Sequence, residues 1–118
     1  MITLYGIKNC DSVKKARKWL ELNHLDYQFH DFRGDGLSPE KVSTWIDIVG
    51  WETLVNKRST TWKELADSVK NDMTAQTATA AILESPTLIK RPLLETSVAT
   101  KTQLMVGFKE DDYKALLL

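Results

Sequence analysis

The hydrophobic period changes twice within the first thirty-two residues, and this change constrains the fold more than any other feature of the sequence. Residues 2–5 alternate loosely between apolar and polar types, residues 11–22 have apolar positions at helical spacing, and residues 27–32 alternate again. Gly6 separates the first of these segments from the second. This order predicts a strand, a helix and a second strand. Such a unit pairs its strands in parallel through a right-handed crossover.

Residues 38–88 predict a helical insertion. A Ser-Pro pair at residues 38–39 is typical of a helix cap followed by the first helical position. Thr61 and Glu64 have the spacing of a capping box and predict a second helix start, and residues 74–83 predict a third helix. The block is too long for a simple connection, so we expect an insertion within the same domain.

The last part of the chain predicts two strands and a helix. Residues 93–95 and 103–108 read as strands close enough to form an antiparallel hairpin, and residues 110–117 have acids first and apolar residues last, as a C-terminal helix should. Together with the first unit they predict an α/β fold in which a small mixed sheet is flanked by helices.

Composition narrows the class of protein. A length of 118 residues favours one domain, residues 1–118, and a formal net charge of zero gives no overall field that attracts nucleic acid or acidic membranes. The single cysteine excludes an internal disulfide, and His24 and His30 lack the partners of a metal site. No apolar run could span a bilayer or act as a signal peptide, so we expect a cytoplasmic protein with a reduced thiol.

Cys10 lies at the expected junction between the first strand and the first helix. The free N–H groups and the dipole of a helix N-terminus favour the nucleophilic thiolate, and Lys8 and Lys14 add positive charge nearby. A small, inert core thiol is the other interpretation, and position alone does not separate the two. Val13 stands where a Cys-x-x-Cys pair would have its second cysteine, so any redox cycle needs a thiol from another molecule.

Two arginines and a proline are further candidates. Arg58 precedes an expected helix start, where it could bind an oxyanion or a carboxylate, although a solvated loop arginine is the commoner case. Arg91 and Pro92 precede an expected strand, and a proline at the first position of a strand removes one ladder donor. A cis bond between them would turn backbone groups toward a site.

Four motifs in this order resemble the ArsC/Spx family, and within it the YffB-like branch. They are residues 6–20 (GIKNCDSVKKARKWL), 56–60 (NKRST), 89–94 (IKRPLL) and 106–108 (VGF). The resemblance covers essentially the whole chain. It implies a thioredoxin/glutaredoxin-like fold with a helical insertion.

The resemblance also implies a site and an activity. Cys10 would be the catalytic thiol of a glutathione-dependent monothiol reductase that acts through a mixed disulfide with glutathione. Glutathione would be a co-substrate, with no permanently bound cofactor, and the substrate would be a small thiol, disulfide or oxyanion. Glutaredoxin is a further candidate partner. The residues implied in binding substrate or glutathione are Lys8, Asn9, Arg58, Arg91 and Pro92, the last after a cis bond.

Three alternatives stay open. Arsenate reductases of this type bind the oxyanion with three arginines; Arg58 and Arg91 match two of them, but Phe108 follows Gly107 where the third would stand. Spx-type regulators bind RNA polymerase and commonly carry Cys-x-x-Cys, a pattern that Val13 breaks. The third alternative is a relic of the fold with an inert thiol.

Overall fold

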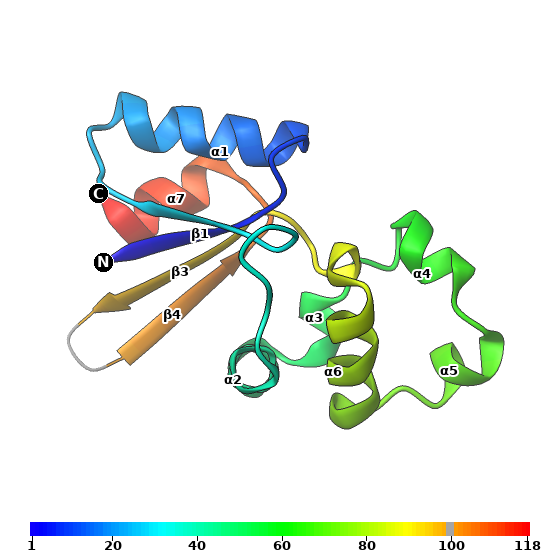
Figure 1. Ribbon diagram of the computed structural model, residues 1–118. Helices are drawn as coiled ribbons and strands as arrows, with labels where there is room; N and C mark the ends of the chain where they lie inside the picture. The colour runs from blue at the N-terminus through cyan, green and yellow to red at the C-terminus, as the bar shows by residue number, and fades with distance from the viewer. Residues whose placement is uncertain (99–100) are drawn as a thin grey trace. The chain divides into compact units, whose positions relative to one another are not determined.

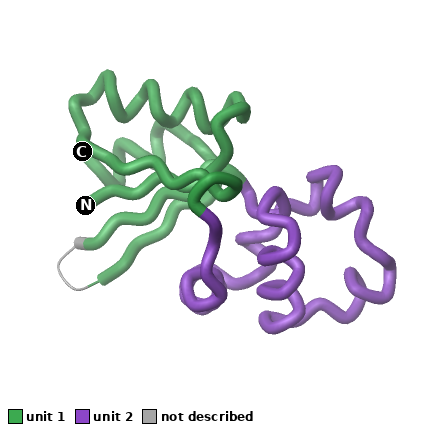
Figure 2. Tube along the Cα trace, viewed as in Figure 1, with its two compact units in different colours: residues 1–35, 91–118 green, residues 36–90 purple. Residues whose placement is uncertain are grey.

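The computed structural model describes residues 1–98 and 101–118, and these form two compact units (Figure 2). Unit 1 comprises Met1–Asp35 and Arg91–Leu118, and unit 2 comprises Gly36–Lys90. Unit 2 therefore interrupts the sequence of unit 1, and its bounds lie close to the expected insertion at 38–88. The expectation that both units form a single domain stays a prediction.

Unit 1 contains a four-stranded mixed sheet in the order β2-β1-β3-β4 (Figure 1). β1 pairs in parallel with β2 and antiparallel with β3, which pairs antiparallel with β4. The α/β fold with a small mixed sheet, including the parallel first unit and the antiparallel hairpin, is thus confirmed. The strands are β1 (Ile2–Gly6), β2 (Gln28–Asp31), β3 (Leu93–Val98) and β4 (Lys101–Val106).

Helices α1 (Asp11–Leu22) and α7 (Glu110–Leu117) cover one face of this sheet (Figure 1). α1 has the predicted bounds because its apolar residues recur every three or four positions and form one buried face. Trp19 of α1 packs edge-on against Tyr113 of α7, with 5.6 Å between ring centroids. The buried cluster beneath the two helices consists of Ile2, Leu4, Ala16, Trp19, Leu20, Leu94 and Tyr113.

Gly6 ends β1 at the point where α1 comes closest to the strand. A Cβ atom at this position would lie 2.7 Å from Cγ2 of Val13, nearer than real Cβ contacts come. We expect Gly6→Ala to lower the free energy of unfolding by about 1–3 kcal/mol, because the added methyl group overpacks the core. Urea denaturation measures this. Gly34→Ala is the control, since its Cβ would meet nothing nearer than 3.6 Å, and equal losses in both variants would contradict the prediction.

Unit 2 is built from helices. α2 begins as predicted, because the Ser38 side chain accepts a hydrogen bond from the Lys41 N–H at 3.2 Å and Pro39 follows it. α2 and α6 pack against each other, and Trp45 of α2 is fully buried. The elements are α2 (Pro39–Val49), α3 (Trp51–Leu54), α4 (Thr60–Glu64), α5 (Asp67–Asn71), α6 (Ala75–Glu84) and the 3-10 helix η1 (Pro86–Leu88).

The predicted capping box of Thr61 and Glu64 is wrong. α4 begins at Thr60, and its cap is Ser59, two residues before Thr61; the Ser59 side chain accepts the Trp62 N–H at 3.1 Å. Ser59 has the extended backbone that a cap needs, with φ −72° and ψ 152°. Thr61 lies inside the helix, and its hydroxyl shares a 2.7 Å hydrogen bond with the hydroxyl of Thr87.

The strand pair also differs from the prediction. β3 continues to Val98, beyond the apolar residues, and β4 begins at Lys101. β4 ends at Val106 rather than at residue 108, because Gly107 has a φ of +79° and turns the chain out of the strand. Phe108 is therefore not a strand residue. Residues 99–100 lie outside the described part of the chain.

Candidate active site

Cys10 is the N-cap residue of α1. Its backbone is extended, with φ −113° and ψ 125°, and its carbonyl accepts a hydrogen bond from the Lys14 N–H at 3.0 Å. The side chain makes no capping hydrogen bond, and the thiol is free and half-buried. The structure therefore puts the thiol where the sequence predicts it, and it is not a fully buried core residue.

Pro92 lies at the end of the sheet from which the cysteine loop departs. Tyr5 of β1 is opposite Leu93 of β3, so the next position along each strand brings Gly6 and Pro92 side by side. Gly107 joins them, because its N–H donates to the Pro92 carbonyl at 2.9 Å. The peptide bond before Pro92 is cis, which confirms that prediction.

Lys8, Asn9 and Arg91 belong to the same end of unit 1. Lys8 and Asn9 are exposed in the loop between β1 and Cys10, and Arg91 directly precedes the cis bond and is half-buried. Within the described residues, neither an ion pair nor a hydrogen bond engages these three side chains. They are thus available for a ligand.

Arg58 belongs to unit 2, in the turn before α4. The Asn56 side chain orders this turn by accepting the Arg58 N–H at 3.0 Å. The Asn56 carbonyl accepts the Ser59 N–H at 3.1 Å and the Ser59 hydroxyl at 2.7 Å. The guanidinium of Arg58 is exposed. The structure thus builds a fixed turn under Arg58, while its convergence with Cys10 of unit 1 stays a prediction.

Lys57 is held by two tryptophans, a feature that the sequence reasoning missed. Its Nζ lies 5.4 Å from the ring centroid of Trp51 and 5.7 Å from that of Trp62. Each contact is a cation–π interaction. The two adjacent cations therefore differ: the Lys57 side chain contacts aromatic rings, whereas the Arg58 side chain has no such contact in the described residues.

Phe108 is the residue at the position where the family resemblance leads us to expect the third arginine of an arsenate reductase. Its ring meets Tyr113 edge-on, with 4.8 Å between centroids, and belongs to the apolar packing around the core of unit 1. The side chain offers neither charge nor donor. An oxyanion at this end of the sheet would lack that contact.

The Tyr113 hydroxyl is buried, and none of the described residues bonds to it. Burial raises the pKa of Tyr113 above its ordinary value of about 10. The Tyr113 phenol therefore keeps its proton more readily in the folded state than in the unfolded chain. The contribution of this difference to the free energy of unfolding is fully present below about pH 10 and is lost as the pH rises above it. We expect Tyr113→Phe to lose less stability than the wild type between neutral pH and about pH 11.

Urea denaturation across this pH range measures the alkaline loss of stability. Tyr27→Phe is the control, because the Tyr27 hydroxyl is partly exposed and accepts a hydrogen bond from Arg17 Nε at 3.0 Å. It should keep the wild-type alkaline loss. If Tyr113→Phe shows the same alkaline loss of stability as the wild type, the raised pKa of Tyr113 is not its cause.

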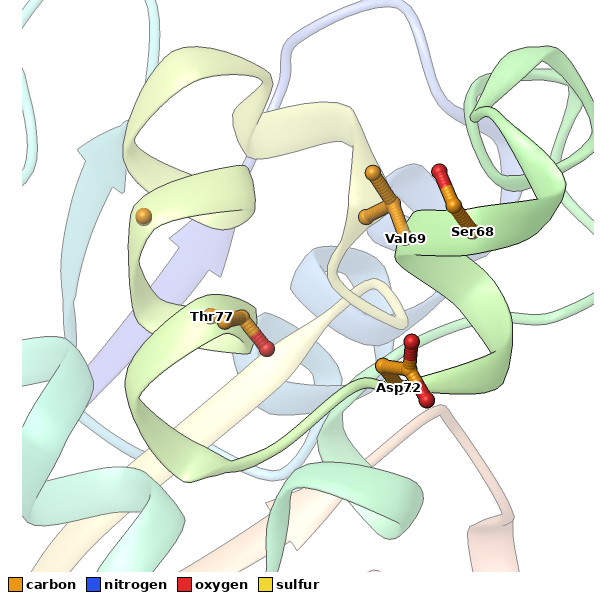
Figure 3. Close-up of a pocket in the computed structure, with 5 residues that line it drawn as sticks. Ser68, Val69, Asp72 and Thr77 are labelled. Carbon is orange, nitrogen blue, oxygen red and sulfur yellow. The ribbon is translucent and has the colours of Figure 1, made fainter.

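A second site candidate lies in unit 2, between α5 and α6 (Figure 3). The cavity holds about 310 Å³, and Asp72 is its single ionisable residue. The Thr77 hydroxyl is already engaged, because it accepts a hydrogen bond from the Thr74 N–H at 2.7 Å. The residues that line the cavity are Ser68, Val69, Asp72, Thr77 and Ala80.

Two other features are absent from the described part of the chain. It contains no group of three or more side chains that could bind a metal ion. No helix in it is long and apolar enough to cross a bilayer.

Comparisons with known proteins place the chain in one family and find relatives along its whole length. The ArsC family model matches residues 5–116. A solved structure of a YffB protein is 39% identical, with a TM-score of 0.92 and coverage of 100% of both chains. An uncharacterized protein of Haemophilus influenzae is 46% identical over 98% of this chain and 97% of its own. The global transcriptional regulator Spx of Lactiplantibacillus plantarum is 29% identical over 99% of this chain and 86% of its own.

Proposed function

Because the chain belongs to the ArsC family and matches a YffB protein over its full length, we propose that it is a glutathione-dependent monothiol reductase. The observation that carries the proposal is the state of Cys10. This single cysteine has a free, half-exposed thiol at the N-terminus of α1, at the end of the sheet that also carries cis-Pro92. Such a thiol can act as a nucleophile, but it needs a second thiol to complete a cycle.

The proposed cycle has two exchange steps. The Cys10 thiolate attacks the glutathione sulfur of a mixed disulfide; the Cys10–glutathione bond forms, the old S–S bond breaks, and the substrate leaves as a thiolate that takes a proton from water. A second glutathione thiolate then attacks the bound glutathionyl sulfur. This step releases glutathione disulfide and restores the Cys10 thiolate. Glutaredoxin is the alternative source of the second thiol, and the cytoplasm is the proposed location because thiols stay reduced there.

Arg58 and Arg91 are the proposed partners of the glutathione carboxylates, with Lys8 and Asn9 beside the thiol and the Pro92 backbone pairing with the peptide. Replacing either arginine with alanine should weaken glutathione binding by about 1.5–3 kcal/mol, the loss of a charge-assisted hydrogen bond. Calorimetry on the Cys10→Ser background isolates binding from chemistry.

Arg33→Ala is the matched control for both arginines, because Arg33 is exposed and its N–H, rather than its guanidinium, bonds to Asp31 Oδ1. Its glutathione affinity should equal that of the parent. Unchanged affinity in both Arg58→Ala and Arg91→Ala would remove them from the site.

Steady-state rates with a glutathione mixed disulfide and with arsenate test the choice of substrate. We expect the mixed disulfide to be reduced and arsenate to be a poor substrate, because Phe108 packs against Tyr113 and supplies no third charge. Efficient arsenate turnover by the wild type would overturn this choice.

An Spx-like regulator is the second candidate function, and the full-length similarity to Spx favours it. Val13 counts against a dithiol sensor, because it stands where the second cysteine of such a sensor would be. Its side chain is fully buried and faces Gly6. A pull-down with RNA polymerase separates the candidates. Specific capture of polymerase by a protein without reductase activity would favour the regulator.

A further inference from the structure

The exposed side of α1 next to Cys10 carries three lysines, Lys14, Lys15 and Lys18, which we name the α1 basic stripe. Within the described residues none of them forms an ion pair. At a rise of 1.5 Å per residue, the three lie about 6, 7.5 and 12 Å along the helix from Cys10. Along the helix axis, Lys14 and Lys15 therefore lie within about one Debye length of Cys10, about 8–10 Å, and Lys18 lies somewhat beyond it.

Arg17, on the same helix, differs from the lysines of the stripe because its side chain packs within the protein. Its Nε donates to the Tyr27 hydroxyl at 3.0 Å, and its guanidinium lies 4.4 Å from the ring centroid of Phe29. The lysines of the stripe have no comparable contact in the described residues. Residues 8–18 contain five basic residues and one acid in a chain with no net charge, so positive charge is concentrated around the thiol.

Leu22 extends the stripe with an apolar group. It is 68% exposed. Lys15, Lys18 and Leu22 are spaced at i, i+3 and i+7 within α1, so they lie on one side of the helix. A row of cations that ends in an apolar side chain matches a polypeptide with acidic and apolar residues.

We propose that the α1 basic stripe and Leu22 dock an acidic polypeptide whose oxidised cysteine is the substrate of Cys10. This proposal rests on the proposed function in one respect, namely that Cys10 is the nucleophile. The substrates it names are protein segments that are rich in Asp and Glu and carry a disulfide. Charge complementarity would act mainly on the rate of encounter. A polypeptide fits better than nucleic acid, because the one arginine of α1 is already engaged and Leu22 offers a contact for an apolar side chain.

The test compares a glutamate-rich peptide with its glutamine counterpart, both containing a leucine and a cysteine joined to thionitrobenzoate. The Cys10 thiolate attacks the peptide sulfur, the peptide–thionitrobenzoate bond breaks, and coloured thionitrobenzoate leaves with the electron pair. With reduced wild type at low salt, we expect the glutamate peptide to react about tenfold faster. The ratio should approach one at about 1 M salt, where the Debye length is about 3 Å.

The variant K15Q/K18Q should lower this ratio at least about threefold, while K63Q/K114Q, with the same charge loss at exposed lysines elsewhere, should not. Uncharged iodoacetamide should alkylate Cys10 equally fast in all three proteins, which separates docking from thiol reactivity. Equal rates for the two peptides at low salt, or equal effects of the two double variants, would overturn the proposal. Stronger competition by an oligonucleotide than by oligoglutamate would overturn it as well.

If neither peptide reacts with Cys10, the proposed reductase function fails. Docking is then measured by anisotropy of a labelled glutamate peptide without a disulfide, on Cys10→Ser. Binding that K15Q/K18Q weakens would support the docking surface without the reductase, and no binding would overturn both.

Discussion

Replacing Cys10 with serine should lower glutathione-linked turnover at least about a thousandfold. The chain has no other cysteine, so no second thiol can take over. A serine hydroxyl cannot form the mixed disulfide that the cycle requires. The initial rate of reduction of a glutathione mixed disulfide, with glutathione in excess, measures the loss.

Ser12→Ala is the matched control, because Ser12 is an exposed residue in the first turn of the same helix. It should keep the wild-type rate. Urea denaturation should show that Cys10→Ser is folded, since the Cys10 side chain makes no capping hydrogen bond that the variant could lose. A folded Cys10→Ser protein with wild-type activity would remove the proposed mechanism.

Replacing Trp19 with alanine should lower the free energy of unfolding by about 3–5 kcal/mol. Trp19 is 7% exposed, lies in the core cluster of unit 1 and packs edge-on against Tyr113. Its removal leaves a cavity between α1 and α7. Since small domains are stable by about 5–15 kcal/mol, the variant would be close to unfolding. Urea denaturation followed by far-UV circular dichroism avoids the change in tryptophan fluorescence.

Leu22→Ala is the control for Trp19→Ala, because it shortens a large apolar side chain of the same helix that is 68% exposed. It should change the unfolding free energy by less than about 0.5 kcal/mol. Similar losses in both variants would mean that α1 is not held to the sheet through its buried face.

The elements with a clear hydrophobic period are the ones that the sequence predicted well. α1 has its predicted bounds because Val13, Ala16 and Leu20 repeat at helical spacing and are all fully buried. The hairpin was predicted only in its apolar part. Ser97 pairs with Thr102 in the ladder, and backbone register rather than side-chain pattern extends the strands to such polar positions.

The short helices of unit 2 could not be predicted in the same way. α3 and α5 have four and five residues, too few for a repeat to show. Capping was ambiguous where several hydroxyl residues follow one another: Ser59 rather than Thr61 is the cap of α4. Thr74 caps α6 with Thr77 as its reciprocal partner, a pairing without the acidic residue that the usual motif has.

For the candidate site, local sequence predicted the position of Cys10, and the family resemblance predicted the cis bond at Pro92. The contacts of Lys57 with two tryptophans were not predicted, because Trp51 and Trp62 belong to different helices and no repeat in the sequence relates them. The packing of Phe108 on Tyr113 depends on the turn at Gly107, which leads the chain out of β4. These contacts join separate elements, so spacing along the chain does not reveal them.

The most direct test of the central claim is the intact mass of the reduced wild type after incubation with glutathione disulfide. The account predicts one glutathionyl adduct per chain, located on Cys10 by peptide mapping and removed by excess glutathione. The chain unfolded in urea is the reference for an unassisted thiol, and the folded protein should form the adduct faster. A folded protein that stays unmodified while the unfolded chain reacts would contradict the account.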